Sequence, residues 1–431
     1  MASSLGARTP PVYQPGHGDS TSRLHHDHGH STTIVEARPR LGGRAHSRDW
    51  TGPRPVESGP VEYGGGWLRA DHTEMTALAT RLGLGLTLTP RAAITRHSHF
   101  RDGTAHADPA EDMPAYTAAL TRLQTDAAQM NDDTPTARAL HSMTLTQYFT
   151  HRAHPAALRR EVLAWWSISG SGDPDLIAAN ELLTPKLAKG LLIKLEELAF
   201  TVQGGVTGLA QAAARACAAD VVLGDPVERL ADLGTHVQAT LASGRVLTAK
   251  TALVALPLNA YAQIRFSPPL TPPQQTLRAS GHAGRALKLL IRAHGPQPGH
   301  LATGEAAGLR WLYADHLLPD GSALLIGFGL YDQTGDPTPQ IVTAALTAAF
   351  PGAELIDFDW HDWCTDPFAR GTWVSPRLTD LPHYAPDHWA PRGRIAFAGS
   401  DLPSPEQGWF EGALLTARTA TAALTALLSK A

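Results

Sequence analysis

The feature that most constrains this chain is a short strand-like segment at residues 32–38 that runs into a glycine-rich turn. Its β-branched run Thr-Thr-Ile-Val predicts a strand that ends at the acidic Glu36. In dinucleotide-binding folds, an acid at the end of a strand accepts a hydrogen bond from a ribose hydroxyl. Gly42, Gly43 and Arg44 then follow, and they can offer backbone N–H groups and a guanidinium to a pyrophosphate. The segment therefore favours an α/β fold that binds a nucleotide.

Composition limits the class of protein. The 431 residues are 43% hydrophobic and 18% charged, which predicts a globular body of two or three domains or one large interlocked unit. A net charge of −4 without a basic run argues against a nucleic-acid partner. Two cysteines, Cys217 and Cys364, exclude a disulfide-stapled secreted scaffold. Neither a membrane span nor the apolar stretch of a signal peptide is found, so we expect a cytoplasmic protein without a membrane partner.

Changes of pattern along the chain suggest how it is organised. Residues 1–31 are rich in Pro, Gly and His, and we expect a disordered tail there. Its histidines could hold a metal ion, but a solvated tail is the preferred interpretation, and we assign no metal ligands: His25, His26, His28 and His30. Strand-like patterns dominate three segments, and helical or mixed patterns fill two insertions between them. The expected discontinuous nucleotide-binding domain comprises 32–70, 201–265 and 374–431, and the expected substrate-binding domain comprises 71–200 and 266–373.

Several further motifs occur in a fixed order between residue 32 and the end of the chain. They are residues 35–44, 62–67, 204–206, 226–227, 363–373, 397–401 and 408–413. Together these motifs resemble the flavin-containing amine oxidases, which include monoamine and polyamine oxidases. The resemblance implies an α/β fold: a Rossmann-like FAD/NAD(P)-binding domain, incomplete at its N-terminus, and an α+β substrate domain of the amine oxidase type.

The resemblance also implies which residues surround FAD. Glu36 matches the residue that binds the adenosine ribose, and Asp401 stands where the family has a glutamate, one methylene longer. The last helix, starting near Gly408, would direct its positive end at the flavin pyrimidine edge. Thr372 occupies the place of the cysteine that attaches the flavin covalently in some members, which implies a non-covalent FAD. The full cofactor-binding set is Glu36, Ala37, Arg38, Gly43, Arg44, Gly65, Gly66, Trp67, Val227, Gly399, Asp401, Gly408, Trp409, Phe410 and Ala413.

Three residues match the catalytic positions of the family. Lys288, flanked by leucines, matches a lysine that reaches flavin N5 through a water, although a lysine on a strand can also alternate outward to solvent. Trp373 and Trp409 match two aromatic residues that admit the amine between them, whereas without the motifs they would be assigned to core packing. The implied reaction is FAD-dependent oxidation of an amine C–N bond by hydride transfer to flavin N5. Oxygen is the expected electron acceptor, and imine and hydrogen peroxide are the expected products. Whether the chain assembles as a homodimer stays an open question.

One element of the family is missing from the sequence pattern. Members begin with a strand and a Gly-x-Gly-x-x-Gly turn that places a helix N-terminus against the pyrophosphate. The early glycines are not spaced in this way, and neither a β-branched strand nor an apolar helix accompanies them: Gly6, Gly16, Gly18 and Gly29. An altered start of the reading frame, a flavin-poor relative, and a partner that supplies the strand are three open explanations. Two alternative functions follow, a non-catalytic scaffold of the same fold and a desaturase or porphyrinogen-type flavin oxidase.

Overall fold

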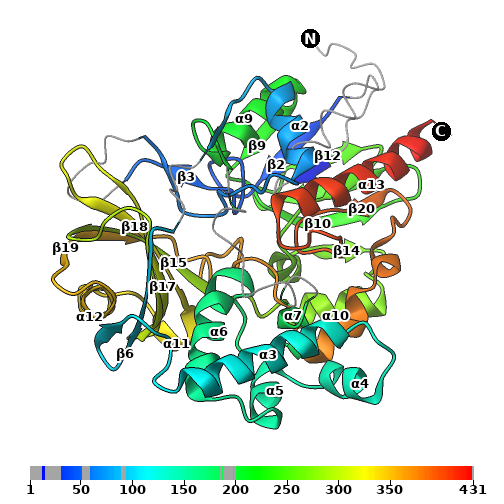
Figure 1. Cartoon of the computed structure of the whole chain (residues 1–431). Helices are drawn as coiled ribbons and strands as arrows, with labels where there is room; N and C mark the ends of the chain where they lie inside the picture. Colours follow the sequence, from blue (N-terminus) through cyan, green and yellow to red (C-terminus); the bar gives the residue numbers. More distant parts are fainter. Residues whose placement is uncertain are drawn as a thin grey trace.

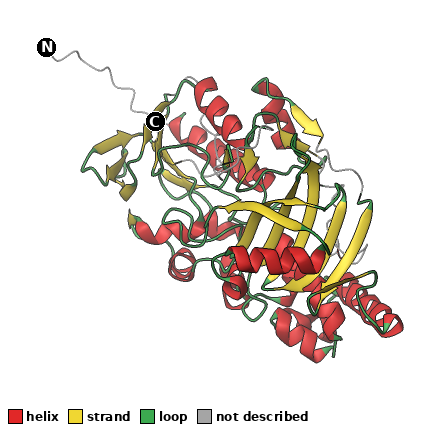
Figure 2. Cartoon of the chain, turned by 90° about the vertical axis from the view of Figure 1, so that its left-hand side faces the viewer, coloured by secondary structure: helices red, strands yellow, loops and turns green. Residues whose placement is uncertain are grey.

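The computed structural model describes residues 12–14, 31–50, 59–88, 94–184, 187, 198 and 200–429. Two sheet-based halves lie side by side, and the last described helix, α13 (Phe410–Leu428), belongs to the upper half in Figure 1. Figure 2 shows the large sheet of the other half with helices packed around it. None of the helices among these residues has both the length and the apolar character needed to cross a bilayer.

The upper half is built on a five-stranded sheet in which every neighbouring pair is parallel. Its strands in spatial order are β20 (Ile395–Phe397), β13 (Ala252–Val254), β1 (Val12–Gln14), β2 (Thr33–Glu36) and β9 (Asp220–Leu223). Because the strands are parallel, their carboxyl ends share one edge. In sheets of this kind that edge is where ligands bind.

The central strand corrects one expectation from the sequence. No strand was expected in residues 1–31, yet β1 pairs with β2 on one side and β13 on the other. The chain therefore supplies its own central strand, and a partner is not needed for it. The histidines and glycines singled out in this segment lie outside the described residues: Gly6, Gly16, Gly18, His25, His26, His28, Gly29 and His30.

Side chains that alternate along the parallel strands form two separate cores, one on each face of the sheet. Ile34 packs towards α9 (Val206–Ala216) and α13 (Phe410–Leu428), whereas the adjacent Val35 packs towards a smaller sheet on the opposite face. That sheet has the order β12 (Val246–Ala249), β11 (Val237–Leu241), β10 (Val227–Asp232) and β14 (Arg265–Ser267). The upper half thus has three layers: helices, parallel sheet and small sheet.

The lower half is built on a seven-stranded sheet whose strands come from both expected insertions. Its order is β19 (Glu354–Trp360), β15 (Ala286–His294), β18 (Ala323–Leu330), β17 (Leu309–Leu317), β16 (His300–Ala306), β6 (Arg96–Arg101) and β7 (Thr104–His106). All pairs are antiparallel except β6 with β16. Contacts of α6 (Ala156–Ser169) run along β15 to β18, while α12 (Pro339–Ala349) contacts β6, β16 and β19.

The remaining elements complete the two halves. Four helices of the lower half share a hydrophobic core with α6: α3 (Met113–Gln129), α4 (Pro135–His141), α5 (Leu145–His151) and α7 (Ala179–Leu182). The side chains of Asp112 and Thr144 cap the N-termini of α3 and α5. The other helices are α2 (Thr73–Arg81), α10 (Pro272–Ser280) and α11 (Tyr331–Thr334). The 3₁₀ helices are Leu258–Gln263, Leu378–Tyr384 and Pro386–Trp389, and the short strands are β3 (Ser47–Arg48), β4 (Val61–Glu62), β5 (Leu86–Leu88) and β8 (Phe200–Val202).

Candidate active site

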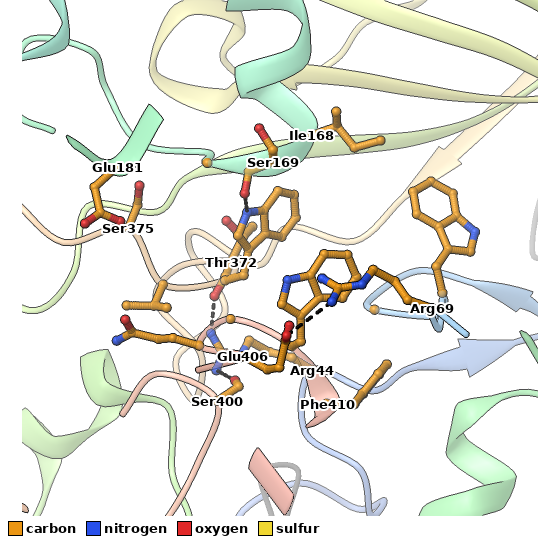
Figure 3. A pocket seen from close by; sticks show the side chains of 18 of the residues that line it. Arg44, Arg69, Ile168, Ser169, Glu181, Thr372, Ser375, Ser400, Glu406 and Phe410 are labelled. Atoms are coloured by element: carbon orange, nitrogen blue, oxygen red, sulfur yellow. Dashed lines mark hydrogen bonds and ion pairs between the residues drawn. The ribbon is translucent and has the colours of Figure 1, made fainter. Parts of the chain in front are cut away.

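A cavity of about 1160 Å³ lies where the two halves meet (Figure 3). It is larger than the few hundred Å³ that a small ligand needs, so it has room for a ring system together with a substrate. Nine of the residues singled out in the sequence line it: Arg44, Gly65, Gly66, Trp67, Lys288, Trp373, Gly408, Trp409 and Phe410.

A buried charge cluster supports one wall of the cavity. Arg44 Nη2 lies 2.6 Å from Asp401 Oδ1, and the other carboxylate oxygen, Oδ2, accepts a hydrogen bond of 2.9 Å from the Leu258 N–H. The His282 ring lies 3.6 Å from the same Oδ2. Burial alone would raise the pKa of Asp401, but Arg44 and His282 hold it well below its usual range. Asp401 is therefore a fixed negative charge that holds the Arg44 guanidinium in place.

The Arg44 side chain has further contacts and one unused donor. Its guanidinium donates to the Thr372 carbonyl oxygen and, over 3.1 Å, to Ser400 Oγ (Figure 3). Its Nε is buried and has no hydrogen-bond partner among the described residues. A buried donor of this kind is costly unless something accepts from it. A phosphate or carbonyl oxygen of a bound cofactor is a suitable acceptor.

The glycine loop of residues 64–66 lies against the chain's own backbone. A Cβ at Gly64 would come within 1.8 Å of the Arg44 carbonyl oxygen, and one at Gly66 within 2.5 Å of Glu62 Cγ. Glycine is thus required here for packing within the protein as well as for backbone exposure to the cavity. Glu62, just before the loop, accepts a hydrogen bond from the Val206 N–H at the start of α9, which anchors the loop to that helix.

Lys288 reaches this loop from β15. Its Nζ donates to the Gly64 carbonyl oxygen over 2.8 Å and lies 5.3 Å from the Trp67 ring centroid. Lys288 lines the cavity, so of the two sequence interpretations the geometry favours the one that directs it inward. An amine held beside a flat aromatic surface and an open space can donate a proton to a ligand or to a water in that space.

The N-terminus of α13 meets the cavity at Trp409 and Phe410. The N-cap residue Trp409 makes no side-chain capping bond, so the positive end of the helix dipole is left to a ligand. The Trp409 ring contacts His72 at 5.2 Å and the Arg69 guanidinium at 5.5 Å. Trp373 contacts Phe328, 6.2 Å between ring centroids, and its Nε1 donates to the Ser169 carbonyl oxygen. Both indoles are thus held at the cavity by their own partners.

The other predicted cofactor residues lie outside the cavity wall. Glu36, 3% exposed, ends β2 at the carboxyl edge of the sheet, and the Asp225 N–H donates to its carbonyl oxygen, which brings the start of β10 at Val227 next to it. The Arg38 guanidinium pairs with Asp366 and lies over Phe368. The remaining predicted residues lie in the β2 turn, after β20 and in the first turn of α13: Ala37, Gly43, Gly399, Asp401 and Ala413.

The structure adds site residues that the sequence did not single out. The end of α6 contributes Trp165, Trp166, Ile168 and Ser169, and α7 contributes Glu181. Burial raises the pKa of Glu181 to about 7. Figure 3 shows Glu181 and Ser375 on the side of the cavity away from Phe410. The adjacent tryptophans of α6 were the sequence signal available for this wall.

The residues present fit an FAD. Five features match the groups of such a cofactor. They are the carboxyl edge of a parallel sheet, a buried acid at the end of β2, a buried arginine with an unused donor, a glycine loop and an uncapped helix N-terminus. Glu36 and Arg38 would face its adenosine part, Arg44 its phosphates, and the glycine loop and Trp67 its ring system.

Known proteins resemble this chain along most of its length. The family model described as flavin containing amine oxidoreductase matches residues 21–425. The chain is similar to (S)-6-hydroxynicotine oxidase of Paenarthrobacter nicotinovorans, with 29% identity covering 92% of this chain and 94% of the relative. It is also similar to pseudooxynicotine dehydrogenase of Pseudomonas sp, with 25% identity covering 90% and 80%, and to putrescine oxidase of Kocuria rosea, with 25% identity covering 91% and 90%.

Solved structures show the same fold. Cyclohexylamine oxidase from Brevibacterium oxydans superimposes with a TM-score of 0.80 and 24% identity, covering 98% of this chain and 100% of that chain. Putrescine oxidase bound to putrescine gives a TM-score of 0.78 and 21% identity, covering 98% and 99%. The expected α/β fold with a Rossmann-like part and a substrate part is confirmed. The chain belongs to the flavin-containing amine oxidoreductase family.

Proposed function

We propose that this protein is an FAD-dependent amine oxidase that passes the electrons of an amine C–N bond to oxygen. Family membership makes it a flavin amine oxidoreductase, and the acceptor, products and site roles are proposals. The observation that supports them is the convergence of the Arg44–Asp401 pair, the glycine loop, Lys288, Trp373 and Trp409 on a single cavity.

The flavin would be held without a covalent bond. The glycine loop and Trp67 would lie along its ring system, Arg44 would face its phosphates, and the N-terminus of α13 would face its pyrimidine edge. Thr372 at the cavity wall accepts a hydrogen bond from the Ala286 N–H, and it offers no thiol for attachment. The adenosine would lie at Glu36 and Val227, outside the cavity.

When bound, the flavin supplies the chemistry, because it accepts a hydride from the substrate α-carbon and then reduces oxygen to hydrogen peroxide while the imine leaves. The chain's own residues would orient the amine and exclude water from the reacting bond. Trp373 and Trp409 would position a neutral amine between their indoles and keep the reacting bond dry. Lys288 would hold a water by its Nζ and provide a proton as oxygen is reduced.

The pocket also suggests which amines fit. Its walls carry indole and phenyl rings and three carboxylates, of which Glu181 lies on the α7 side and Asp71 and Glu406 pair with Arg69. Arg69 is paired with Asp71 and Glu406, so its positive charge does not repel an amine. Apolar amines, and amines with a second positive charge that Glu181 can bind, are therefore the proposed substrates.

An oxygen electrode and a peroxide assay test this function. The first panel is (S)-6-hydroxynicotine, pseudooxynicotine, putrescine and cyclohexylamine, because the names of the relatives specify these compounds. We expect oxygen uptake and peroxide in equal amounts with at least one of them. Hydrophobic polyenes that are consumed in place of amines would support the desaturase alternative. A protein that releases no flavin on boiling would support the scaffold alternative.

The electron acceptor has a specific rival. Three relatives are named dehydrogenases, for pseudooxynicotine, for nicotine and for L-amino acids. The same panel is therefore repeated without oxygen and with an artificial electron acceptor. Faster turnover under those conditions would contradict oxygen as the acceptor and leave the amine chemistry intact.

For cell location we propose the cytoplasm, since the two cysteines are buried free thiols that suit a reducing compartment. Assembly as a homodimer stays open.

A further inference from the structure

A second group of side chains that could bind a metal ion lies apart from the cavity, within the lower half of the molecule. His97 and His99 on β6 and Glu161 on α6 each place one ligand atom within 4.8 Å of the other two. None of the three lines the cavity. Imidazole nitrogen and carboxylate oxygen are donors that divalent transition metals bind.

The backbone explains why these side chains meet. Residues two apart on a strand point to the same face, so both imidazoles of β6 face α6, which packs over the sheet. The ring centroids of His97 and His99 are 4.4 Å apart. Glu161 Oε2 lies 3.0 Å from His99 Nδ1. Thr303 of β16, paired in register with His99, places its hydroxyl 2.8 Å from His97 Nε2 and 2.7 Å from Glu161 Oε2.

The Glu161 carboxylate has one oxygen that the described residues leave without a partner. Glu161 is 2% exposed, and its Oε1 is buried without a hydrogen-bond partner among the described residues. A buried carboxylate is costly unless an opposite charge compensates it. Its other oxygen contacts the Thr303 hydroxyl and the His99 imidazole. A divalent cation bound between the two imidazoles and this carboxylate would compensate the carboxylate charge.

We propose that His97, His99 and Glu161 form a binding site for a divalent transition-metal ion, with Zn²⁺ as the best match. Two imidazoles and one carboxylate leave a fourth position of a tetrahedral zinc site for water, and zinc–ligand bonds of about 2.0–2.2 Å require ligand atoms about 3.3 Å apart. Thr303 would orient the carboxylate by its hydrogen bond. His97 is exposed and provides the path by which the ion enters.

Such a site would have a structural role. The metal would join the β6–β16 end of the large sheet to α6, and the following turn of α6 carries Trp165 and Trp166 at the cavity wall. Zinc would therefore stabilise the substrate-binding half and hold that wall. No step of the amine oxidation passes through it.

Zinc binding by the full chain tests the site. The four clustered histidines of the tail are replaced by alanine in every sample, so that they do not compete: His25, His26, His28 and His30. We expect about one zinc per chain by elemental analysis after free metal is removed, and a tetrahedral absorption band when Co²⁺ is bound instead. His97→Ala, at an exposed position, should weaken binding at least about tenfold and abolish that band. His294→Ala, an exposed histidine on β15, is the matched control and should change neither.

Three results would overturn the assignment, two of them from metal content and the third from Glu161→Gln. The first is the absence of bound zinc in a folded protein, and the second is unchanged metal content in His97→Ala. Glu161→Gln separates metal binding from packing, because the amide can still accept the Thr303 hydrogen bond but ligates zinc poorly. If Glu161→Gln keeps both the fold, by circular dichroism, and the full zinc affinity, the carboxylate is not a ligand and the proposal fails.

Discussion

Replacing Asp401 by Asn tests the buried charge pair on which the cavity wall rests. Asp401 is 1% exposed and lies 2.6 Å from Arg44 Nη2. At that distance the Coulomb attraction is about 6 kcal/mol with an effective dielectric constant of about 20. Desolvation of both ions offsets part of it, and breaking a buried pair typically costs about 3–5 kcal/mol. Asn keeps the size of the side chain and an acceptor for the Leu258 N–H, so we expect the free energy of unfolding to fall by about 3–5 kcal/mol.

Urea denaturation followed by circular dichroism measures this change, with and without added FAD. Asp133→Asn is the matched control, because its pair with Arg138 is exposed and such pairs contribute less than about 1 kcal/mol. If Asp401→Asn destabilises the protein no more than Asp133→Asn, the pair does not hold the site together and the reasoning is wrong.

The pH dependence gives an independent check on the same residue. Burial would raise the pKa of Asp401, but Arg44 and His282 lower it further than burial raises it. A depressed folded-state pKa contributes stability that is complete above the unfolded value of about 4 and is lost as pH falls. The wild type should therefore lose stability steeply below about pH 4, and Asp401→Asn should show a shallower loss.

Three further substitutions test the proposed roles. Lys288→Met should slow reoxidation by oxygen about 100-fold in stopped-flow measurements while the melting temperature stays unchanged, and the exposed Lys250→Met should leave both unchanged. Burial raises the pKa of Glu36 to about 7, so the free energy of unfolding of the FAD-free protein should fall as pH rises from about 4.5 to 7. Glu36→Gln should remove that fall, which is on the order of 3 kcal/mol, and urea titrations at pH 8 measure the difference. Glu181→Gln should raise KM about tenfold for putrescine and leave KM for cyclohexylamine unchanged, because only putrescine carries a second positive charge.

Each of the three has an outcome that contradicts it. Unfolding of Lys288→Met would assign the lysine to structure. A pH profile of Glu36→Gln identical to that of the wild type would show that Glu36 is not a buried acid with a raised pKa. Equal effects of Glu181→Gln on both amines would remove the carboxylate from substrate selection.

Local motifs made much of the site predictable. The strand ending in Glu36, the glycine loop at Gly65 and the start of the last helix near Gly408 are each set by residues close in sequence, so their pattern indicated these elements, and the family resemblance assigned them to the cofactor. The inward position of Lys288 was one of two alternatives, because alternation along a strand fixes which residues share a face but not which face meets the cavity.

Long-range pairing could not be read from the chain. Strand β1 is three residues, Val-Tyr-Gln, between prolines, without the apolar run typical of a central parallel strand, and its partners β2 and β13 alone give it that place. Strand β6 pairs with β16, about two hundred residues later, so the meeting of His97 with Glu161 had no local signal. The adjacent tryptophans of α6 stand out in the sequence, but the sequence does not show that they face the cavity. The pairing of Arg38 with Asp366 is likewise a product of the folded chain.

The central claim is that these segments bind a flavin that an amine reduces, and an anaerobic titration tests it most directly. The purified protein should show the visible absorption bands of oxidised flavin, lose them when an amine from the panel is added without oxygen, and regain them on admission of air. A protein loaded with FAD whose bands persist with every amine, or a protein that binds no FAD at all, would contradict the account.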